Sequence, residues 1–139
     1  MADIVPPEVR SRMMSAIRGK DTKPEMIVRR GLHAIGFRYR LHDRRLPGHP
    51  DLVLPKHKVA IFVHGCFWHH HDCDYFKWPK TRPDFWRDKI GQNVERDKKA
   101  IRKLQDMGWR VLVVWECSLK SKDLIVGKIE EIAKWIEDA

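Results

Sequence analysis

The segments VAIFV (residues 59–63) and VLVVW (residues 111–115) are uninterrupted apolar runs. Runs of this length without polar alternation are typical of strands covered on both faces of a sheet. Between them, residues 83–107 place apolar side chains at helical spacing, with Pro83 near the start and Gly108 just after the end. A strand, a helix and a second strand in this order predict a parallel pair joined by a right-handed crossover.

The flanking segments complete an α/β fold. Thr22 is placed to cap a helix over residues 24–35, and residues 37–43, FRYRLHD, alternate apolar and polar side chains as an outer strand does. Residues 51–54 form a further short strand, and residues 123–137 form a last helix with apolar side chains at helical spacing. We therefore expect a mixed β-sheet flanked by helices on both faces.

Length and charge narrow the class of protein. The chain has 139 residues and a formal net charge of +9, so we expect one core domain over residues 21–139 with a field that attracts DNA or RNA. Residues 1–20 are a polar, basic segment that could act as an arm ordering on a partner. The alternative for the charge is a basic surface without a nucleic-acid partner. Apolar runs too short for a membrane span and the lack of a signal peptide indicate a cytoplasmic protein.

Three cysteines and a histidine have the donor chemistry of a zinc site. Cys66, His71 and Cys73 lie within eight residues, and Cys117 follows the strand at residues 111–115. If the two buried strands are parallel, their ends open on one edge, and Cys117 reaches the loop as a fourth ligand. A closed Cys3His site is structural because it leaves no position for substrate. The alternatives are free thiols beside a histidine-rich loop, or a different ligand among residues 69–71, of which His71 is preferred.

An aspartate at a strand start suggests a second, catalytic metal. Asp51 begins one short strand and His64 ends the next, which is the layout of the PD-(D/E)xK nucleases. Mg²⁺ prefers oxygen ligands, which the Asp51 carboxylate and the Val63 carbonyl could supply. The motif itself is incomplete, because His64 stands at the second carboxylate position and Cys66 at the usual lysine position. The alternative for Asp51 is an ordinary turn at the start of a strand.

Histidines near this edge could move protons. An imidazole with a pKa near neutrality can take a proton from water or give one to a leaving oxygen, and both His64 and His69 flank the predicted zinc loop. Glu25, in the first turn of the helix at residues 24–35, could orient one of them or hold a metal-bound water. The alternative for Glu25 is an acid favoured by the helix dipole.

Aromatic side chains accompany the basic residues of the same region. Phe67 and Trp68 lie inside the polar loop, and Trp86 follows Lys80 and Arg82 near the start of the long helix. Such side chains can insert between base pairs, which costs least where pairing is already weak, as at a mismatch. The alternative is that Trp68 and Trp86 only pack over the zinc loop.

The run IFVHGCFWHHHDC (residues 61–73), with LPGHPDLVL upstream and FWRDKIGQNVERD and GWRVLVVWEC downstream, resembles the very short patch repair endonucleases over roughly residues 10–120. The resemblance implies a restriction-endonuclease-like fold and a DNA endonuclease that uses Mg²⁺. It further implies hydrolysis on the 5′ side of the T in a T:G mismatch left by deaminated methylcytosine. The functional partner would be a cytosine methyltransferase, and we expect a monomer.

The resemblance also implies a role for each candidate residue. Asp51 would bind the catalytic metal with the Val63 carbonyl, and His69 would act as general acid/base supported by His64 and Glu25. The implied zinc ligands are Cys66, His71, Cys73 and Cys117. The implied DNA contacts are the wedge residues Phe67, Trp68 and Trp86, and Met14 of the basic arm with its neighbour Met13.

Two other functions fit the residues less completely. A restriction-type nuclease on the same scaffold would also cut perfectly paired DNA. A zinc-stabilised DNA-binding module without catalysis would leave Asp51, His64 and His69 without roles.

Overall fold

The computed structural model describes residues 22–67, 69–71, 73 and 76–138. The arm predicted at residues 1–20, including Met14, therefore lies outside the described residues. Within these described residues, four strands form one open sheet in the order β1 (Arg40–Leu41), β2 (Leu52–Leu54), β3 (Val59–His64) and β4 (Arg110–Trp115). Strands β1, β2 and β3 pair antiparallel, whereas β3 and β4 pair parallel. The prediction of a mixed sheet is confirmed.

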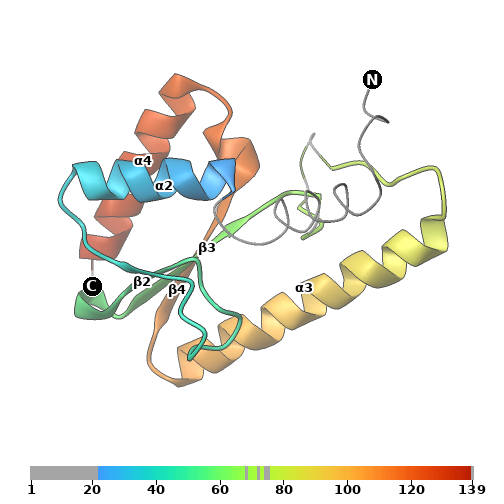
Figure 1. The fold of residues 1–139 in the computed structure, drawn as a ribbon, viewed down its shortest axis with the longest axis horizontal. Helices are drawn as coiled ribbons and strands as arrows, with labels where there is room; N and C mark the ends of the chain where they lie inside the picture. Colours follow the sequence, from blue (N-terminus) through green and yellow to red (C-terminus); the bar gives the residue numbers. More distant parts are fainter. Residues whose placement is uncertain (1–21, 68, 72, 74–75, 139) are drawn as a thin grey trace, which may run out of the picture.

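In the described part of the chain, three helices cover the two faces of this sheet (Figure 1). α2 (Lys23–Ala34) and α4 (Lys122–Glu137) lie together on one face, and the long α3 (Pro83–Asp106) crosses the other. α3 connects β3 to β4, as the two apolar runs predicted. In the described part of the chain, no helix is both long and apolar enough to cross a membrane.

Strand β3 is the centre of both hydrophobic layers because successive side chains of a strand point to opposite faces. Val59 and Ile61 pack in the core that α2 and α4 cover, whereas Ala60 and Phe62 pack against Leu104 of α3 and its neighbours. Neither core is complete without this strand. The continuous apolar run at residues 59–63 therefore reflects burial on both sides.

Helix α2, Lys23–Ala34, lies within one residue at each end of the helix predicted at residues 24–35. The Thr22 side chain accepts a hydrogen bond from the Glu25 backbone N–H at 3.4 Å, which caps α2. After the helix, Gly36 has φ +102°, a left-handed conformation that glycine adopts at low cost. The cap sets Glu25 in the first turn, where its side chain is almost fully buried.

The outer strand is shorter than predicted. The segment 37–43 contributes only Arg40 and Leu41 to the sheet. Before them, the Tyr39 hydroxyl donates to the Arg29 carbonyl at 2.8 Å, so this part of the chain is held to α2. After them, His42 has φ +49°, which ends extended pairing. Alternation of apolar residues did not reveal either anchor.

Arg110 joins the start of β4 to the end of α4. Its guanidinium donates to the carbonyls of Trp135 at 2.9 Å, Ile136 at 2.7 Å and Asp138 at 3.1 Å. It also lies 4.7 Å from the centroid of the Trp135 ring. The last carbonyls of a helix have no partner within the helix. The Arg110 guanidinium therefore satisfies three backbone carbonyls at the negative end of the α4 dipole.

We therefore expect Arg110→Lys to lower the free energy of unfolding by about 1–3 kcal/mol, because a single ammonium cannot reproduce this fork of donors. Urea denaturation followed by circular dichroism measures the change. Arg102→Lys on the exposed side of α3 is the control and should change stability by less than about 0.5 kcal/mol. Equal stability of the two variants would contradict the assigned role.

Candidate active site and metal centre

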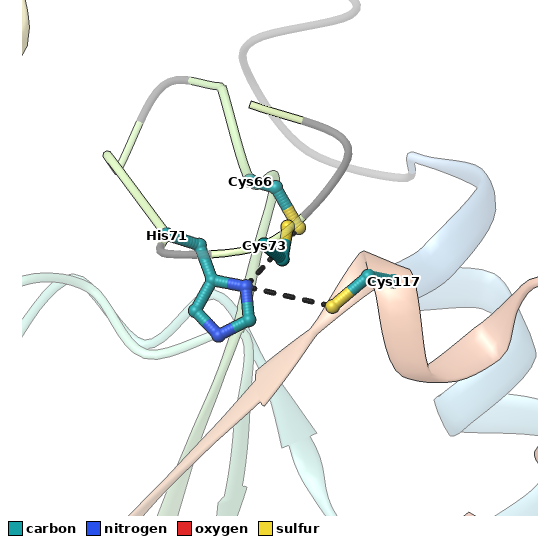
Figure 2. A group of neighbouring side chains, drawn as sticks. All are labelled: Cys66, His71, Cys73 and Cys117. Carbon is teal, nitrogen blue, oxygen red and sulfur yellow. Dashed lines mark hydrogen bonds between the residues drawn. The ribbon is translucent and has the colours of Figure 1, made fainter. Parts of the chain in front are cut away.

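The parallel ends of β3 and β4 bring four sulfur and nitrogen donors together (Figure 2). Cys66, His71 and Cys73 come from the loop after β3, and Cys117 comes from the short 3-10 helix η3 (Glu116–Leu119) after β4. The His71 Nδ1 lies 3.6 Å from the Cys66 Sγ and 3.5 Å from the Cys117 Sγ. The structure thus brings together the four residues predicted as one ligand set.

These separations suit a tetrahedral metal. Bonds of about 2.3 Å to sulfur and about 2.0 Å to nitrogen, at tetrahedral angles, place the two donor atoms roughly 3.5 Å apart. Burial raises the pKa of the Cys66 thiol to about 12 and also raises the pKa of Cys117. A coordinated cation reverses this effect because it stabilises the thiolate. The four residues could therefore hold a metal ion.

The loop after β3 is tied to the end of β4 and to the 3-10 helix η3, which carries the fourth donor. Glu116, next to Cys117, accepts a hydrogen bond from the Cys66 N–H through its Oε1 at 2.9 Å. The His71 ring stacks on Trp115, with centroids 4.1 Å apart and planes 11° from parallel. Trp115 at the end of β4 and Glu116 at the start of η3 thus orient two donors of the loop.

A second cluster lies at the start of β2 and contains Asp51, Glu25 and His42, with one potential ligand atom of each within 4.8 Å of the others. The Asp51 Oδ2 accepts a hydrogen bond from the Val63 N–H at 2.7 Å. The Glu25 Oε2 lies 2.8 Å from the His42 Nε2 and 3.2 Å from an Arg29 nitrogen. The structure therefore places Asp51, Glu25 and the Val63 backbone together, as a metal site requires.

Burial governs the charge of Asp51. Removal from water raises the pKa of this carboxyl to about 7, and the Glu25 carboxylate beside it adds to the rise, while the Val63 N–H opposes it. Two carboxylates so close are stabilised by a cation that neutralises both. This is the chemistry expected of residues that bind a divalent metal.

A third cluster contains His64, His69 and Asp97. The imidazoles of His64 and His69 stack with centroids 3.7 Å apart and planes 2° from parallel. The His69 Nδ1 pairs with the Asp97 Oδ2. Burial, with a smaller contribution from His69, lowers the pKa of His64 to about 4, so His64 is neutral at neutral pH. The three residues line a cavity of about 170 Å³ between α3 and β4.

The second and third clusters meet at two consecutive residues. Val63 binds Asp51 through its backbone, and His64 stacks on His69 through its side chain. A carboxylate cluster that could hold a cation and a histidine–carboxylate pair therefore meet at consecutive residues of β3. Such an arrangement can hold a phosphate and activate a water molecule beside it.

The predicted wedge is only partly described. Phe67 contacts the Trp86 ring edge-to-face at 5.5 Å and stacks on Phe76 at 5.9 Å. Trp68 lies outside the described residues. Arg82 lies 4.4 Å from the ring of Phe85, next to Trp86. Aromatic rings and a guanidinium thus gather where α3 begins.

Sequence reasoning missed Asp97 and His42. Asp97 carried a signal, because it is an acid among Ile90, Val94 and Ile101 on the apolar side of the long helix. A carboxylate there needs a partner, which is His69. His42 carried no signal, since its position depends on where the outer strand ends and on its left-handed backbone.

Comparison with known proteins adds an independent line of evidence. The model of the family described as DNA mismatch endonuclease Vsr matches residues 2–75. The chain is 46% identical over 138 residues to the DNA mismatch endonuclease Vsr of Escherichia coli K12, covering 98% of this chain and 88% of that protein. It is 45% identical to the type II nicking enzyme V.NmeAIP of Neisseria meningitidis, covering 100% and 99%. It is also 45% identical to V.XorIIP of Xanthomonas oryzae, covering 95% and 97%.

The buried Asp51 makes stability depend on pH when no divalent metal is added. In the folded chain the pKa of Asp51 is about 7, so the carboxyl keeps its proton up to that pH. An unfolded chain releases the proton near the ordinary pKa of 3.8. Stability of the wild type should therefore fall as pH rises between these values. Asp51→Asn removes the penalty and should be more stable by about 2–4 kcal/mol at alkaline pH, with little difference at about pH 4.

Urea titrations of both proteins across this pH range in magnesium-free buffer measure the difference. Asp43→Asn is the control, because Asp43 pairs with Arg45 at the surface and its pKa is lowered. A stability difference between Asp51→Asn and wild type that stays constant with pH would contradict the assignment.

Proposed function

Because the chain belongs to the Vsr family of DNA mismatch endonucleases, it is a DNA endonuclease, and we propose that it nicks one strand of a duplex at a T:G mismatch. The cut would fall on the 5′ side of the mismatched T. The observation that carries the proposal is the meeting of a buried carboxylate cluster with a histidine–aspartate pair at residues 63–64 of β3. The relatives named nicking enzymes support cleavage of a single strand.

Asp51 and the backbone of Val63 would hold the catalytic Mg²⁺. The N–H and C=O of one strand residue point to the same side, so the Val63 carbonyl faces the edge on which its N–H meets Asp51. When bound there, magnesium supplies stabilisation of charge on the scissile phosphate and a lowered pKa for a water molecule. Glu25 would orient that water, since its buried carboxylate lies beside Asp51.

His69 would act as the general acid/base. Asp97 pairs with its Nδ1, so that Nδ1 carries the proton and Nε2 is left to accept one from the attacking water. His64 is neutral and stacked on the His69 ring, and it would restrict the ring to one plane without competing for the proton. Asp97 would then stabilise the imidazolium that forms, as the carboxylate of a catalytic triad does.

The Cys66, His71, Cys73 and Cys117 cluster would hold a structural Zn²⁺. Its four donors would close the tetrahedron, so this ion would take no part in hydrolysis. Its role would be to hold the loop that follows β3, which carries both His69 and Phe67. Loss of the ion would therefore affect the position of catalytic and DNA-contacting side chains together.

Phe67, Trp68 and Trp86 would form the wedge that enters the duplex at the mismatch. A mismatched step resists unstacking less than a paired one, so insertion there is favoured. The basic arm at residues 1–20, including Met14, would contact the other side of the DNA, and residues 21–139 would form the endonuclease domain. The net charge of +9 favours association with the phosphate backbone.

The T:G pair would arise where methylcytosine deaminates to thymine. A cytosine methyltransferase that marks the same site is therefore the expected functional partner, in the cytoplasm of a bacterial cell. We also propose that the enzyme acts as a monomer, because one chain supplies every residue of the catalytic constellation.

The test is a nicking assay on an end-labelled duplex with one T:G pair in a methyltransferase-type site, with the flanking bases varied. We expect magnesium-dependent nicking of the T strand, 5′ to the T, and none of the C:G duplex. Asp51→Ala should abolish nicking while leaving DNA binding intact, because Asp51 holds the metal but is not part of the wedge that contacts DNA. Glu95→Gln, on the exposed side of α3, is the control and should nick at the wild-type rate.

Equal cutting of the paired and mismatched duplexes would replace this proposal with a restriction-type nuclease. Binding of DNA with no nicking of any flanking sequence would indicate a non-catalytic zinc-stabilised binding module. Wild-type nicking by Asp51→Ala would overturn the assignment of the metal ligand.

Elemental analysis of reduced, metal-replete protein should find about one zinc per chain, as one four-ligand site requires. Cys117→Ser should lower both the zinc content after dialysis and the thermal stability, because it opens the tetrahedron. Ser118→Ala, one residue away, is the control and should retain zinc. Protein that contains no zinc under these conditions would contradict the site.

A further inference from the structure

His42 lies in the carboxylate cluster at the start of β2, although it has no place in the mechanism above. Its Nε2 is 2.8 Å from the Glu25 Oε2, and it shares with Glu25 and Asp51 a set of ligand atoms within 4.8 Å of one another. Among the described residues, this is the cluster in which a nitrogen donor joins two carboxylates on separate elements.

The backbone holds His42 at this position from the other side. Its N–H donates to the Asp51 carbonyl at 3.1 Å, so residues 42 and 51 are paired at the edge of the sheet. Its φ of +49° is a left-handed conformation that costs a non-glycine residue about 1 kcal/mol. The turn directs the imidazole toward Glu25 across the start of α2. The ring is therefore held in place by the same strand residue whose carboxylate belongs to the cluster.

The chemistry of the three donors differs from that of a magnesium site made of oxygen alone. Mg²⁺ takes oxygen ligands and gains little from an imidazole, whereas first-row transition cations bind imidazole nitrogen well. Adding one nitrogen to two carboxylates should therefore raise affinity for Mn²⁺ or Co²⁺ more than for Mg²⁺. The two carboxylates supply the charge for either kind of cation.

We propose that His42 is a ligand of the metal site formed with Asp51 and Glu25, and that its nitrogen makes the site prefer a divalent first-row transition cation such as Mn²⁺ over Mg²⁺. This inference rests on the proposed function only in that it concerns the same site. A purely structural role for His42 would be different: the imidazole would only pair with Glu25, which Arg29 also contacts at 3.2 Å. In that case the bound cation would have no nitrogen ligand.

The test uses full-length protein with the Cys/His cluster loaded with zinc and no DNA. Mn²⁺ is titrated calorimetrically, and pulsed electron paramagnetic resonance detects coupling of bound Mn²⁺ to a nitrogen nucleus. The wild type should show this coupling. His42→Gln should lose it and bind Mn²⁺ at least about tenfold more weakly, with a smaller change for Mg²⁺.

His33→Gln, at the exposed end of α2, is the matched control and should behave as the wild type. Asp51→Asn should abolish Mn²⁺ binding if the cation lies in this cluster. As a measurement that needs no substitution, Mn²⁺ added to wild-type protein should broaden the His42 ring resonances before those of His33. These results would support the proposal.

Nitrogen coupling that persists in His42→Gln would overturn the proposal and assign the nitrogen to another histidine. If His42→Gln weakened the binding of Mn²⁺ and Mg²⁺ equally, and the wild type showed no nitrogen coupling, the proposal would also be overturned. His42 would then be only a partner of Glu25. All of these readouts are obtained without DNA. Failure of mismatch nicking is therefore distinguishable from failure of this inference.

Discussion

The parallel pairing of β3 with β4 is the constraint on which the rest of the structure depends. The register that sets His64 opposite Trp115 makes the two strands end together. The loop after β3 and the 3-10 helix after β4 then meet, which brings Cys117 to Cys66 and Glu116 to the Cys66 backbone. A shift of one residue in this pairing would turn Trp115 to the opposite face of the sheet, move η3 with Cys117 along β3, and separate the four donors.

The same strand divides its residues between structure and chemistry. Val59 to Phe62 alternate between the two cores, and the strand is buried there on both faces. At its end, Val63 and His64 no longer serve only packing: one contacts Asp51 through the backbone, and the other stacks on His69. The buried half of β3 therefore fixes the position of the residues at its end, which contact Asp51 and His69.

Burying two acids and several imidazoles at this edge opposes folding unless each has a partner. Glu25 is paired by Arg29 and His42, Asp51 by the Val63 N–H, and His69 by Asp97. Asp51 nevertheless keeps a raised pKa, because the loss of water and, to a smaller extent, the neighbouring Glu25 outweigh its one hydrogen bond. Burial of Asp51 without a cation thus lowers the free energy of unfolding at neutral pH, at the place where we propose that a cation binds.

Local pattern was enough to predict much of this protein. The apolar runs predicted β3 and β4, and apolar residues at helical spacing predicted α2, α3 and α4. The short spacing of Cys66, His71 and Cys73 indicated a donor cluster, and Cys117 was predicted to join it because parallel strands end on one edge of the sheet. These features depend on neighbours in sequence, so they can be read there. The length of the outer strand could not be predicted from the sequence, because the Tyr39 hydrogen bond to α2 and the His42 hydrogen bond to Asp51 form only in the folded chain. Only the tertiary structure set Asp97 against His69 and His42 against Glu25, since each pair joins elements whose relative position is decided by packing on the sheet.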